Sequence, residues 1–143
     1  VTRNVCEYEY GYRYVRHFED EWFVGATFNL DLDEQGTKVV SIKELLTQRA
    51  QSQPIGKKNC GSVFKNPEQG YAAQLIEKCG LKGFSIGGAC VSDKHANFII
   101  NEKKATAKDI EELIEHVQKT VKQQCNIDLV PEVKFLGNEG ATS

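Results

Sequence analysis

Apolar residues that repeat at helical spacing predict where the chain forms helices. The longest such segment is 106–125, in which Thr106 and Asp109 have the form of an N-terminal capping box. One face of this segment follows the i, i+3, i+4, i+7 rule, with apolar residues at Ile110, Leu113, Ile114, Val117 and Val121. We therefore expect the longest helix of the chain to begin after Thr106.

Two shorter helices are predicted earlier in the chain. One spans residues 72–79, where four apolar residues share a helical face and Gly80 follows as a typical C-terminal stop. The other begins at Ser41, which with Glu44 predicts a second capping box, and runs to about residue 51. A proline and a glycine within residues 52–58 then break the chain, so this segment is the best candidate for a domain boundary.

Strand periodicity predicts five extended segments. Tyrosines stand at every second position of residues 8–14, and the other β-rich segments are 22–30, 84–91, 96–100 and 129–136. Pro131 lacks an N–H donor, which favours an edge position or a strand start for the last of these. Strands and helices together predict a mixed α+β fold with two main helices and short strands.

Residues 61–71 combine a glycine, a hydroxyl, a cation, a carboxamide and a proline in one short segment. The sequence reads Gly-Ser-Val-Phe-Lys-Asn-Pro-Glu-Gln-Gly-Tyr. Glycines near both ends and a proline in the middle exclude the interior of a helix or of a central strand. We therefore expect a shaped loop, which is where binding and catalytic groups concentrate.

Composition limits the class of protein and its partners. A length of 143 residues allows one ordinary domain, or one domain with part of another. The chain is 40% hydrophobic and 27% charged, which is typical of a globular protein. A net charge of −2 gives no general attraction for nucleic acid or an anionic membrane, and no apolar run is long enough to cross a bilayer. We expect neither nucleic acid nor a membrane as a partner.

Five cysteines are scattered along the chain without a CxxC pair or a histidine at zinc-ligand spacing. This pattern favours reduced thiols, mostly packed as small hydrophobes in a cytoplasmic protein, over a metal site. The chain contains no methionine, not even an initiator, which is typical of a processed or excised piece.

Five blocks of residues carry a family resemblance. They are Gly-Ser-Val-Phe-Lys-Asn-Pro (61–67), Leu-Lys-Gly with Ile-Gly-Gly-Ala (81–83 and 86–89), Val-Ser (91–92), His-Ala-Asn-Phe-Ile-Ile-Asn (95–101) and Pro-Glu-Val-Lys-Phe-Leu-Gly (131–137). In this order they resemble the substrate-binding domain of the UDP-N-acetylenolpyruvoylglucosamine reductases, the flavoenzymes of peptidoglycan synthesis. Upstream, residues 11–13 and 26–28 resemble the end of the family's flavin-binding region.

The resemblance implies a domain organisation. Residues 1–52 correspond to the C-terminal part of the second flavin-binding domain, 53–136 to the substrate-binding domain, and 137–143 to a tail. The short spacing between Gly70 and Leu81 is similar to the family's compact subgroup, which lacks an inserted tyrosine-bearing loop. The N-terminal flavin-binding domain of the family has no counterpart here, and no GxGxxG loop is found. The chain alone is therefore expected to be inactive and to retain little FAD.

The resemblance also implies a reaction and the residues that perform it. With FAD and NADPH, the family reduces UDP-N-acetylglucosamine enolpyruvate to UDP-N-acetylmuramate. Ser62 matches the proton-donating serine, and Glu132 matches the acid that assists protonation and stabilises the enolic intermediate. Arg13 matches an arginine that contacts the substrate carboxylate, for which a guanidinium is suited. The family follows this arginine with a polar pair, whereas Tyr14-Val15 stands here, so an ordinary surface arginine is the alternative.

Further residues match binding positions of the family. Asn66 corresponds to a sugar-nucleotide contact and Lys82 to a diphosphate contact, and Lys65 is the expected neighbour that polarises Ser62 or binds substrate. His95 is either a nucleotide contact or a solvated loop histidine. The match assigns Tyr12 and Gly61 to the cofactor. No metal ligand is implied.

A second function remains open at this stage. The chain would then be a non-catalytic module that keeps the fold and a nucleotide-sugar pocket. The presence of both Ser62 and Glu132 disfavours it, because a pure binding module needs neither. The Tyr14-Val15 pair that follows Arg13 favours it mildly.

Overall fold

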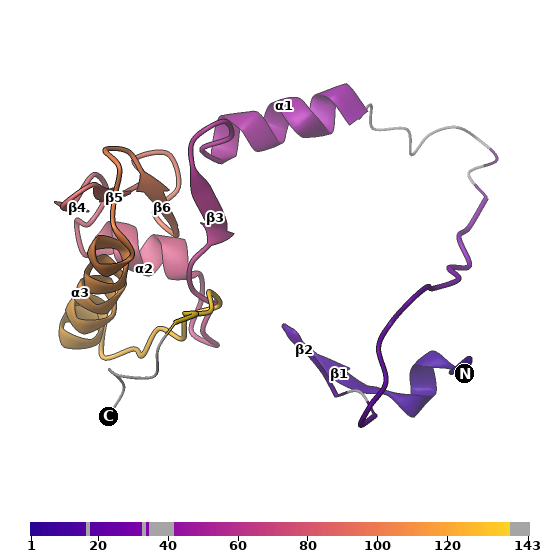
Figure 1. Cartoon of the computed structure of the whole chain (residues 1–143). Coiled ribbons are helices and arrows are strands. Elements are labelled where there is room, and N and C mark those ends of the chain that lie inside the picture. The colour runs from indigo at the N-terminus through magenta and orange to yellow at the C-terminus, as the bar shows by residue number, and fades with distance from the viewer. Residues whose placement is uncertain (17, 33, 35–41, 138–143) are drawn as a thin grey trace. The chain divides into compact units, whose positions relative to one another are not determined.

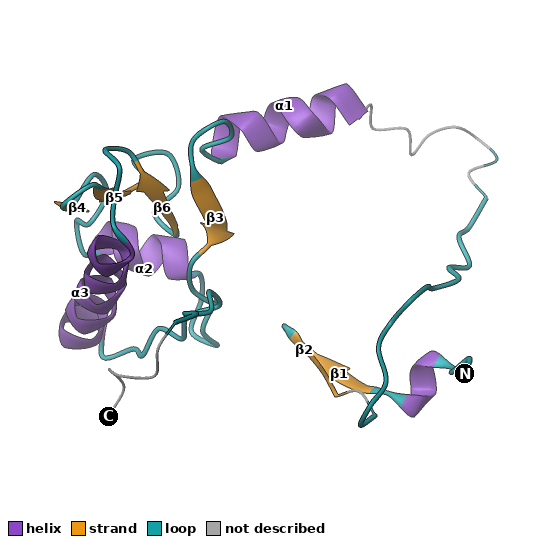
Figure 2. Cartoon of the chain, viewed as in Figure 1, coloured by secondary structure: helices purple, strands orange, loops and turns teal. Residues whose placement is uncertain are grey.

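A computed structural model describes residues 1–16, 18–32, 34 and 42–137. The chain divides into two compact units, Val1–Val39 and Val40–Ser143 (Figure 1). Helices, strands and loops are distinguished in Figure 2. Ser41, the predicted helix cap, lies outside the described residues, as does nearly all of the predicted tail. The domain boundary predicted near residue 52 stays a prediction.

The first unit contains a short 3-10 helix, Val5–Glu7, and a β-hairpin of β1, Glu9–Gly11, and β2, Tyr14–Arg16. The prediction of one continuous strand over residues 8–14 is therefore wrong. The chain reverses at Tyr12-Arg13, where Arg13 has a φ of +63°. Such left-handed backbone is typical of a two-residue hairpin turn, and Gly11 pairs directly with Tyr14 across it.

Residues 18–32, the described segment after the hairpin, contain no helix or strand. The predicted strand over residues 22–30 is wrong, because no described segment pairs with it and a strand needs a neighbour for its hydrogen bonds. Its large apolar side chains are exposed, Trp22 at 81%. The segment instead joins the start of the chain through Arg3, which contacts Glu21 at 2.6 Å and lies 3.7 Å over the Phe18 ring.

A four-stranded antiparallel sheet forms the second unit's scaffold. Its strands are β3, Asn59–Ser62; β4, Ser85–Ile86; β5, Ala89–Val91; and β6, Phe98–Asn101. They lie in the order β3-β6-β5-β4. The single strand predicted over 84–91 is in fact the hairpin of β4 and β5, and its turn is Gly87-Gly88.

Close approach of the chain to itself explains the two turn glycines. Gly87 has a φ of +53°, and a Cβ added there would collide with the Asp109 carboxylate. A Cβ on Gly88 would lie 2.5 Å from the Ala105 nitrogen and 2.6 Å from the Lys103 oxygen. Only glycines therefore allow this turn to lie so close to the start of the third helix and to the residues before it. A bound ligand is not needed to explain the two glycines.

All three predicted helices are present: α1, Ile42–Ser52; α2, Ala72–Lys78; and α3, Ala107–Cys125. The Thr106–Asp109 capping box at the start of α3 is confirmed, with the Asp109 N–H donating to Thr106 Oγ1 at 3.1 Å. The predicted stop of α2 is also confirmed. Gly80 has a φ of +71°, and the Leu81 N–H donates to the Ile76 carbonyl, as in a Schellman motif.

The core of the second unit lies between the sheet and the two later helices. α3 contacts α2, β4 and β5 (Figure 1). The face of α3 predicted to be apolar is buried at Leu113, Ile114, Val117 and Val121, and Ile110 is half-buried at its edge. Ala72 and Ile76 of α2 are buried in the same cluster. The sequence therefore identified the packing faces of both helices, and the mixed α+β fold is confirmed.

The last extended segment forms a single bridge instead of the predicted strand. Phe64 and Pro131 form an isolated antiparallel bridge, closed by the Lys65 N–H to the Val130 carbonyl at 2.9 Å and by the Glu132 N–H to the Val63 carbonyl at 2.8 Å. The Val63 N–H donates to the Asn97 carbonyl at 2.9 Å and not back to Glu132, so the ladder does not extend beyond this bridge. The strand prediction over 129–136 is wrong, whereas the edge character inferred from Pro131 fits the single bridge.

The five cysteines are free thiols. Cys6 and Cys60 are exposed, while Cys79, Cys90 and Cys125 are half-buried at or near the core. Among the described residues, no three histidine, cysteine or acidic side chains gather into a group that could hold a metal ion. No helix in the described part of the chain is long and apolar enough to span a membrane.

Candidate active site

Ser62 ends strand β3 immediately after a β-bulge. Asn59 pairs with Ile100 and Ser62 with Phe98, so three steps along β3 match two along β6. Gly61 supplies the extra residue with a φ of +86°, and its N–H donates to Asn59 Oδ1 at 2.9 Å. Bulges of this kind redirect the side chain that follows. The half-buried Ser62 therefore owes its orientation to a glycine in left-handed backbone.

Glu132 lies beside the segment that follows Ser62. Its N–H donates to the Val63 carbonyl at 2.8 Å, so two residues 69 positions apart in the sequence adjoin at this point. The residue is half-buried, and its Oε2 atom is buried from solvent. The main chains of the two predicted catalytic residues are thus brought together. That their side chains face one cleft stays a prediction.

A buried side-chain amide holds the same segment from its other side. Asn97 accepts from the Phe64 N–H through Oδ1 at 2.9 Å and donates through Nδ2 to the Phe64 carbonyl at 2.8 Å. Its own carbonyl accepts from the Val63 N–H at 2.9 Å. Sequence reasoning gave Asn97 no role of its own. The Asn97 side chain continues the β3–β6 ladder past Ser62, and no local pattern could have shown this.

Lys65 and Asn66 follow in the loop that leads to α2. The Lys65 main chain is held by Val130, and its side chain is half-buried. Asn66 is exposed, and its Oδ1 accepts from the Ala72 N–H at 3.1 Å at the first residue of α2. Asn66 therefore supports the start of the helix, since N-terminal helix N–H groups need acceptors outside the helix. The binding roles predicted for both residues stay predictions.

Lys82 precedes β4 and His95 follows β5, and the Gly83 N–H donates to the Val91 carbonyl at 2.9 Å, so the chain segments that carry them adjoin. Burial lowers the pKa of His95, and the positive charge of Lys82 lowers it further to a smaller extent. Lys82 also contacts Glu77 at 2.7 Å. A diphosphate bound by Lys82 would therefore compete with this carboxylate for the ammonium group. The His95 ring is half-buried against Phe98, with ring centroids 4.8 Å apart.

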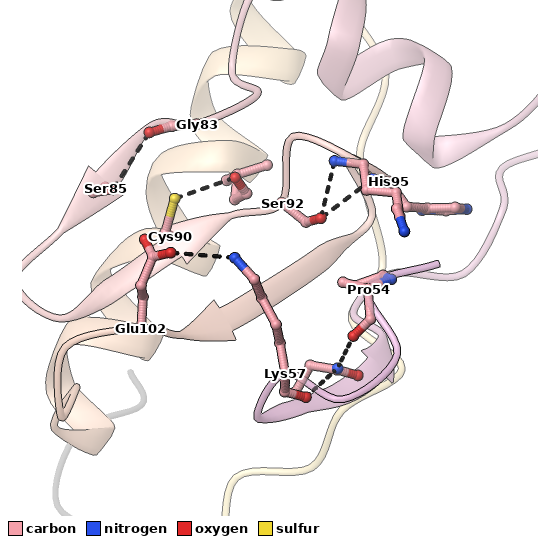
Figure 3. A network of polar contacts seen from close by, with 11 residues as sticks. Pro54, Lys57, Gly83, Ser85, Cys90, Ser92, His95 and Glu102 are labelled. Atoms are coloured by element: carbon pink, nitrogen blue, oxygen red, sulfur yellow. Dashed lines mark hydrogen bonds and ion pairs between the residues drawn. The ribbon is translucent and has the colours of Figure 1, made fainter. Parts of the chain in front are cut away.

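The turn that carries His95 is internally hydrogen-bonded (Figure 3). The buried Ser92 hydroxyl accepts from the N–H groups of Lys94 at 3.2 Å and His95 at 3.3 Å. His95 Nδ1 in turn accepts from the Asn97 N–H at 3.3 Å. The turn between β5 and β6 therefore connects the His95 ring to the main chain of Asn97, the residue whose side-chain amide bonds Phe64. Its fixed geometry suits a loop that positions a binding group.

Tyr12 and Arg13 belong to the first unit and form the tip of its hairpin. Both are exposed, and the Arg13 Cζ atom lies 5.7 Å from the centre of the Tyr12 ring. The Tyr14 ring lies close over Gly11, where an added Cβ would be 2.5 Å from Tyr14 Cε1. Tyr14, which replaces a polar residue expected after Arg13, thus packs across the hairpin. The roles predicted for Arg13 and Tyr12 stay predictions.

A cavity of about 420 Å³ lies next to this site. It is formed by β3, β6, α3 and the segment after Glu132, and Val63 and Val133 are among its lining residues. These two residues are the chain neighbours of Ser62 and Glu132, which are not part of the lining. The lining is mostly apolar, so this cavity differs in character from the polar loops described above.

The second unit is thus an α+β domain in which Ser62 and Lys65 lie on a segment, 62–66, that is hydrogen-bonded both to Asn97 and to the segment of Glu132. A sequence model of the "UDP-N-acetylenolpyruvoylglucosamine reductase, C-terminal domain" family matches residues 53–136. The chain belongs to this family. The resemblance stated from the sequence is confirmed.

Similar proteins carry the same description. A UDP-N-acetylenolpyruvoylglucosamine reductase of Legionella pneumophila (strain Corby) is 51% identical over 138 residues, covering 96% of this chain and 45% of that protein. The reductase of Methylococcus capsulatus is 49% identical over 141 residues, covering 99% of this chain and 46% of that protein. The chain thus spans about half the length of these relatives.

The crystal structure of UDP-N-acetylenolpyruvylglucosamine reductase (MurB) from Thermus caldophilus is similar at 38% identity. The match covers 61% of this chain and 31% of that one, with a TM-score of 0.49.

Proposed function

We propose that this chain is the substrate-binding and proton-donating part of an enzyme that reduces UDP-N-acetylglucosamine enolpyruvate to UDP-N-acetylmuramate. The observation that carries the proposal is the bond between the Glu132 N–H and the Val63 carbonyl, beside a bulge that orients Ser62. Family membership and the names of the relatives support it. An enzyme of this kind acts in bacterial peptidoglycan synthesis, and a cytoplasmic location stays a prediction.

Ser62 is the proposed proton donor. Reduction of the enolpyruvyl double bond adds a hydride to one carbon and a proton to the other. The Ser62 Oγ–H gives the proton, and the alkoxide that remains is stabilised by the Lys65 ammonium group until solvent restores the hydroxyl. Glu132 is the proposed acid that assists protonation and stabilises the enolic intermediate, and its Oε2 atom is buried from solvent.

Lys82, Asn66 and His95 are the proposed contacts to the nucleotide and sugar. The Gly83–Val91 bond joins the chain segments that carry Lys82 and the half-buried His95, which supports a shared binding surface for a charged ligand. Lysine suits a diphosphate because it is a flexible point charge with three donors. Arg13, with its planar guanidinium, is the proposed partner of the substrate carboxylate.

FAD is the proposed cofactor, with NADPH as its reductant. When bound, reduced FAD supplies the hydride for the reaction. The space beside Gly61 is open to at least 4 Å, which is compatible with a large ligand nearby, and Tyr12 is an exposed ring at a hairpin tip. Two residues are too few to bind a whole dinucleotide. We therefore propose that most of the cofactor is held by a flavin-binding domain such as the longer relatives contain, and that this chain alone is inactive.

A titration of the chain with UDP-N-acetylglucosamine enolpyruvate tests the proposal. We expect heat of binding in calorimetry and shifted amide resonances for residues 62–66 and 92–98. Lys82→Ala should weaken binding at least about tenfold, because one charge-assisted contact is lost. Lys108→Ala is the matched control, since Lys108 is an exposed lysine paired with Glu112 on α3.

Two outcomes would contradict the proposal in different ways. Absence of heat together with unshifted resonances would mean that the chain has no preformed substrate site. Binding that Lys82→Ala and Lys108→Ala weaken equally would remove Lys82 from the diphosphate site.

A further inference from the structure

The segment Val63-Phe64 is held on both sides by hydrogen bonds. On one side are Glu132 and Val130, which bond Val63 and Lys65. On the other side is Asn97, which bonds Val63 through its main chain and Phe64 through both ends of its side-chain amide. The central segment is buried, with Val63 at 0% and Phe64 at 2% exposure.

Asn97 takes the place of a main-chain partner in this arrangement. A side-chain amide that accepts from the N–H and donates to the C=O of one residue reproduces the pair of bonds that a neighbouring strand would form. The residue is 4% exposed, so its bonds to Phe64 lie away from bulk water. Loss of the amide would leave the Phe64 N–H and C=O buried without these partners, which is costly for strong polar groups.

We propose that Asn97 is the positioning residue for the proton donor of this enzyme. It fixes the two residues after Ser62 on the side opposite the Glu132 segment, and thereby sets the separation of Ser62 from Glu132. Asn97 does not contact the reacting atoms and acts through the position of Ser62. The inference rests on the proposed function, because it assigns Asn97 a part in that reaction.

The chain offers a matched control four residues further along. Asn101 also uses both ends of its amide on one main-chain residue: its Oδ1 accepts from the Ala105 N–H at 2.8 Å, and its Nδ2 donates to the Ala105 carbonyl at 3.4 Å. Its partner lies in the turn before α3 and not in the segment after Ser62. Asn101→Ala removes the same chemistry and leaves the Ser62 segment bonded.

A double-mutant cycle in the complete enzyme tests the inference. We expect Asn97→Ala to lower kcat about 10²-fold, as a displacement of about 1 Å at a reacting group does, with KM for the UDP-sugar changed much less. In a Ser62→Ala background, Asn97→Ala should have no further effect on the residual rate. Asn101→Ala should have the same small effect in both backgrounds, because it does not act through Ser62.

The outcomes separate this inference from the proposed function. If Ser62→Ala itself leaves kcat intact, the proposed function fails. Suppose instead that Ser62→Ala lowers turnover strongly. The positioning role is then overturned if Asn97→Ala leaves the wild-type kcat unchanged. It is also overturned if Asn97→Ala lowers the residual rate of Ser62→Ala by the same factor as it lowers the wild-type rate. Should Asn97→Ala not fold, Asn97→Asp, which keeps the shape and the acceptor to Phe64, takes its place in the same cycle with the same criteria.

Discussion

The Glu132 N–H donates a 2.8 Å hydrogen bond to the Val63 carbonyl, which places the main chain of Glu132 beside the residue that follows Ser62. The proposed acid and the proposed proton donor come from opposite ends of the second unit's sequence. This bond depends on the main chain and not on the Glu132 side chain. Substitution of the carboxyl group therefore tests its chemistry without loss of the contact.

Glu132→Gln in the complete enzyme should lower kcat by about 10²–10⁴-fold, because a general acid or charge-stabilising group contributes on that scale. KM for the UDP-sugar should change little, since the amide keeps the shape of the side chain. Steady-state kinetics would check this. An unchanged kcat would show that Glu132 does not act as an acid in the reaction.

We expect Asp109 to make the folded chain less stable as the pH falls into the acid range. Hydrogen bonds from the N–H groups of Thr106 and Gly88 lower the pKa of Asp109 below its ordinary value. The stability that these bonds confer is complete above the ordinary carboxyl pKa and is lost as the pH falls through the lowered, folded-state value. Urea unfolding between pH 2 and pH 6 should show a shallower acid loss in Asp109→Asn than in the wild type, whereas an identical slope would contradict this.

Gly88→Ala should destabilise the second unit by roughly 1–3 kcal/mol, the usual range for overpacking. Its Cβ would meet main-chain atoms of Lys103 and Ala105, which cannot move aside as a flexible side chain can. Gly137→Ala is the control, because an added Cβ there meets nothing within 4 Å. Equal midpoints of thermal unfolding for the two variants would refute the close approach.

Hydrogen exchange should differ sharply between the two units. None of the described residues before position 35 is buried, whereas α3 and β6 contribute Leu113, Val117 and Ile99 to a buried core. Amides of α3 and β6 should exchange only through global unfolding, and amides of residues 22–32 should exchange nearly unprotected. Protection of residues 22–32 equal to that of α3 would show that their exposed aromatic side chains are buried by self-association.

Local signals predicted the helices well. The start of α3 depends on Thr106 and Asp109, which are three residues apart, and its buried face on a short-range repeat. The end of α2 depends on Gly80 alone, because a left-handed residue is cheapest there as glycine. Such features need no distant partner, so the sequence contains them in full.

Structural features that depend on partners distant in the sequence could not be predicted from local patterns. The sequence alone placed Gly87-Gly88 inside a strand, because it does not show that Lys103 and Ala105 lie close to this pair. The predicted strand at 22–30 has no described partner, and its apolar residues alone could not show this. Asn97 reads as one polar residue among apolar neighbours, because its partner Phe64 lies 33 positions away.

Rapid mixing of the reduced complete enzyme with substrate shows whether the Ser62 hydroxyl donates the proton. In Ser62→Ala, NADPH should still reduce the flavin at the wild-type rate, while the reduced flavin should fail to be reoxidised by UDP-N-acetylglucosamine enolpyruvate. Reoxidation at the wild-type rate, with UDP-N-acetylmuramate as the product, would show that Ser62 is not the proton donor.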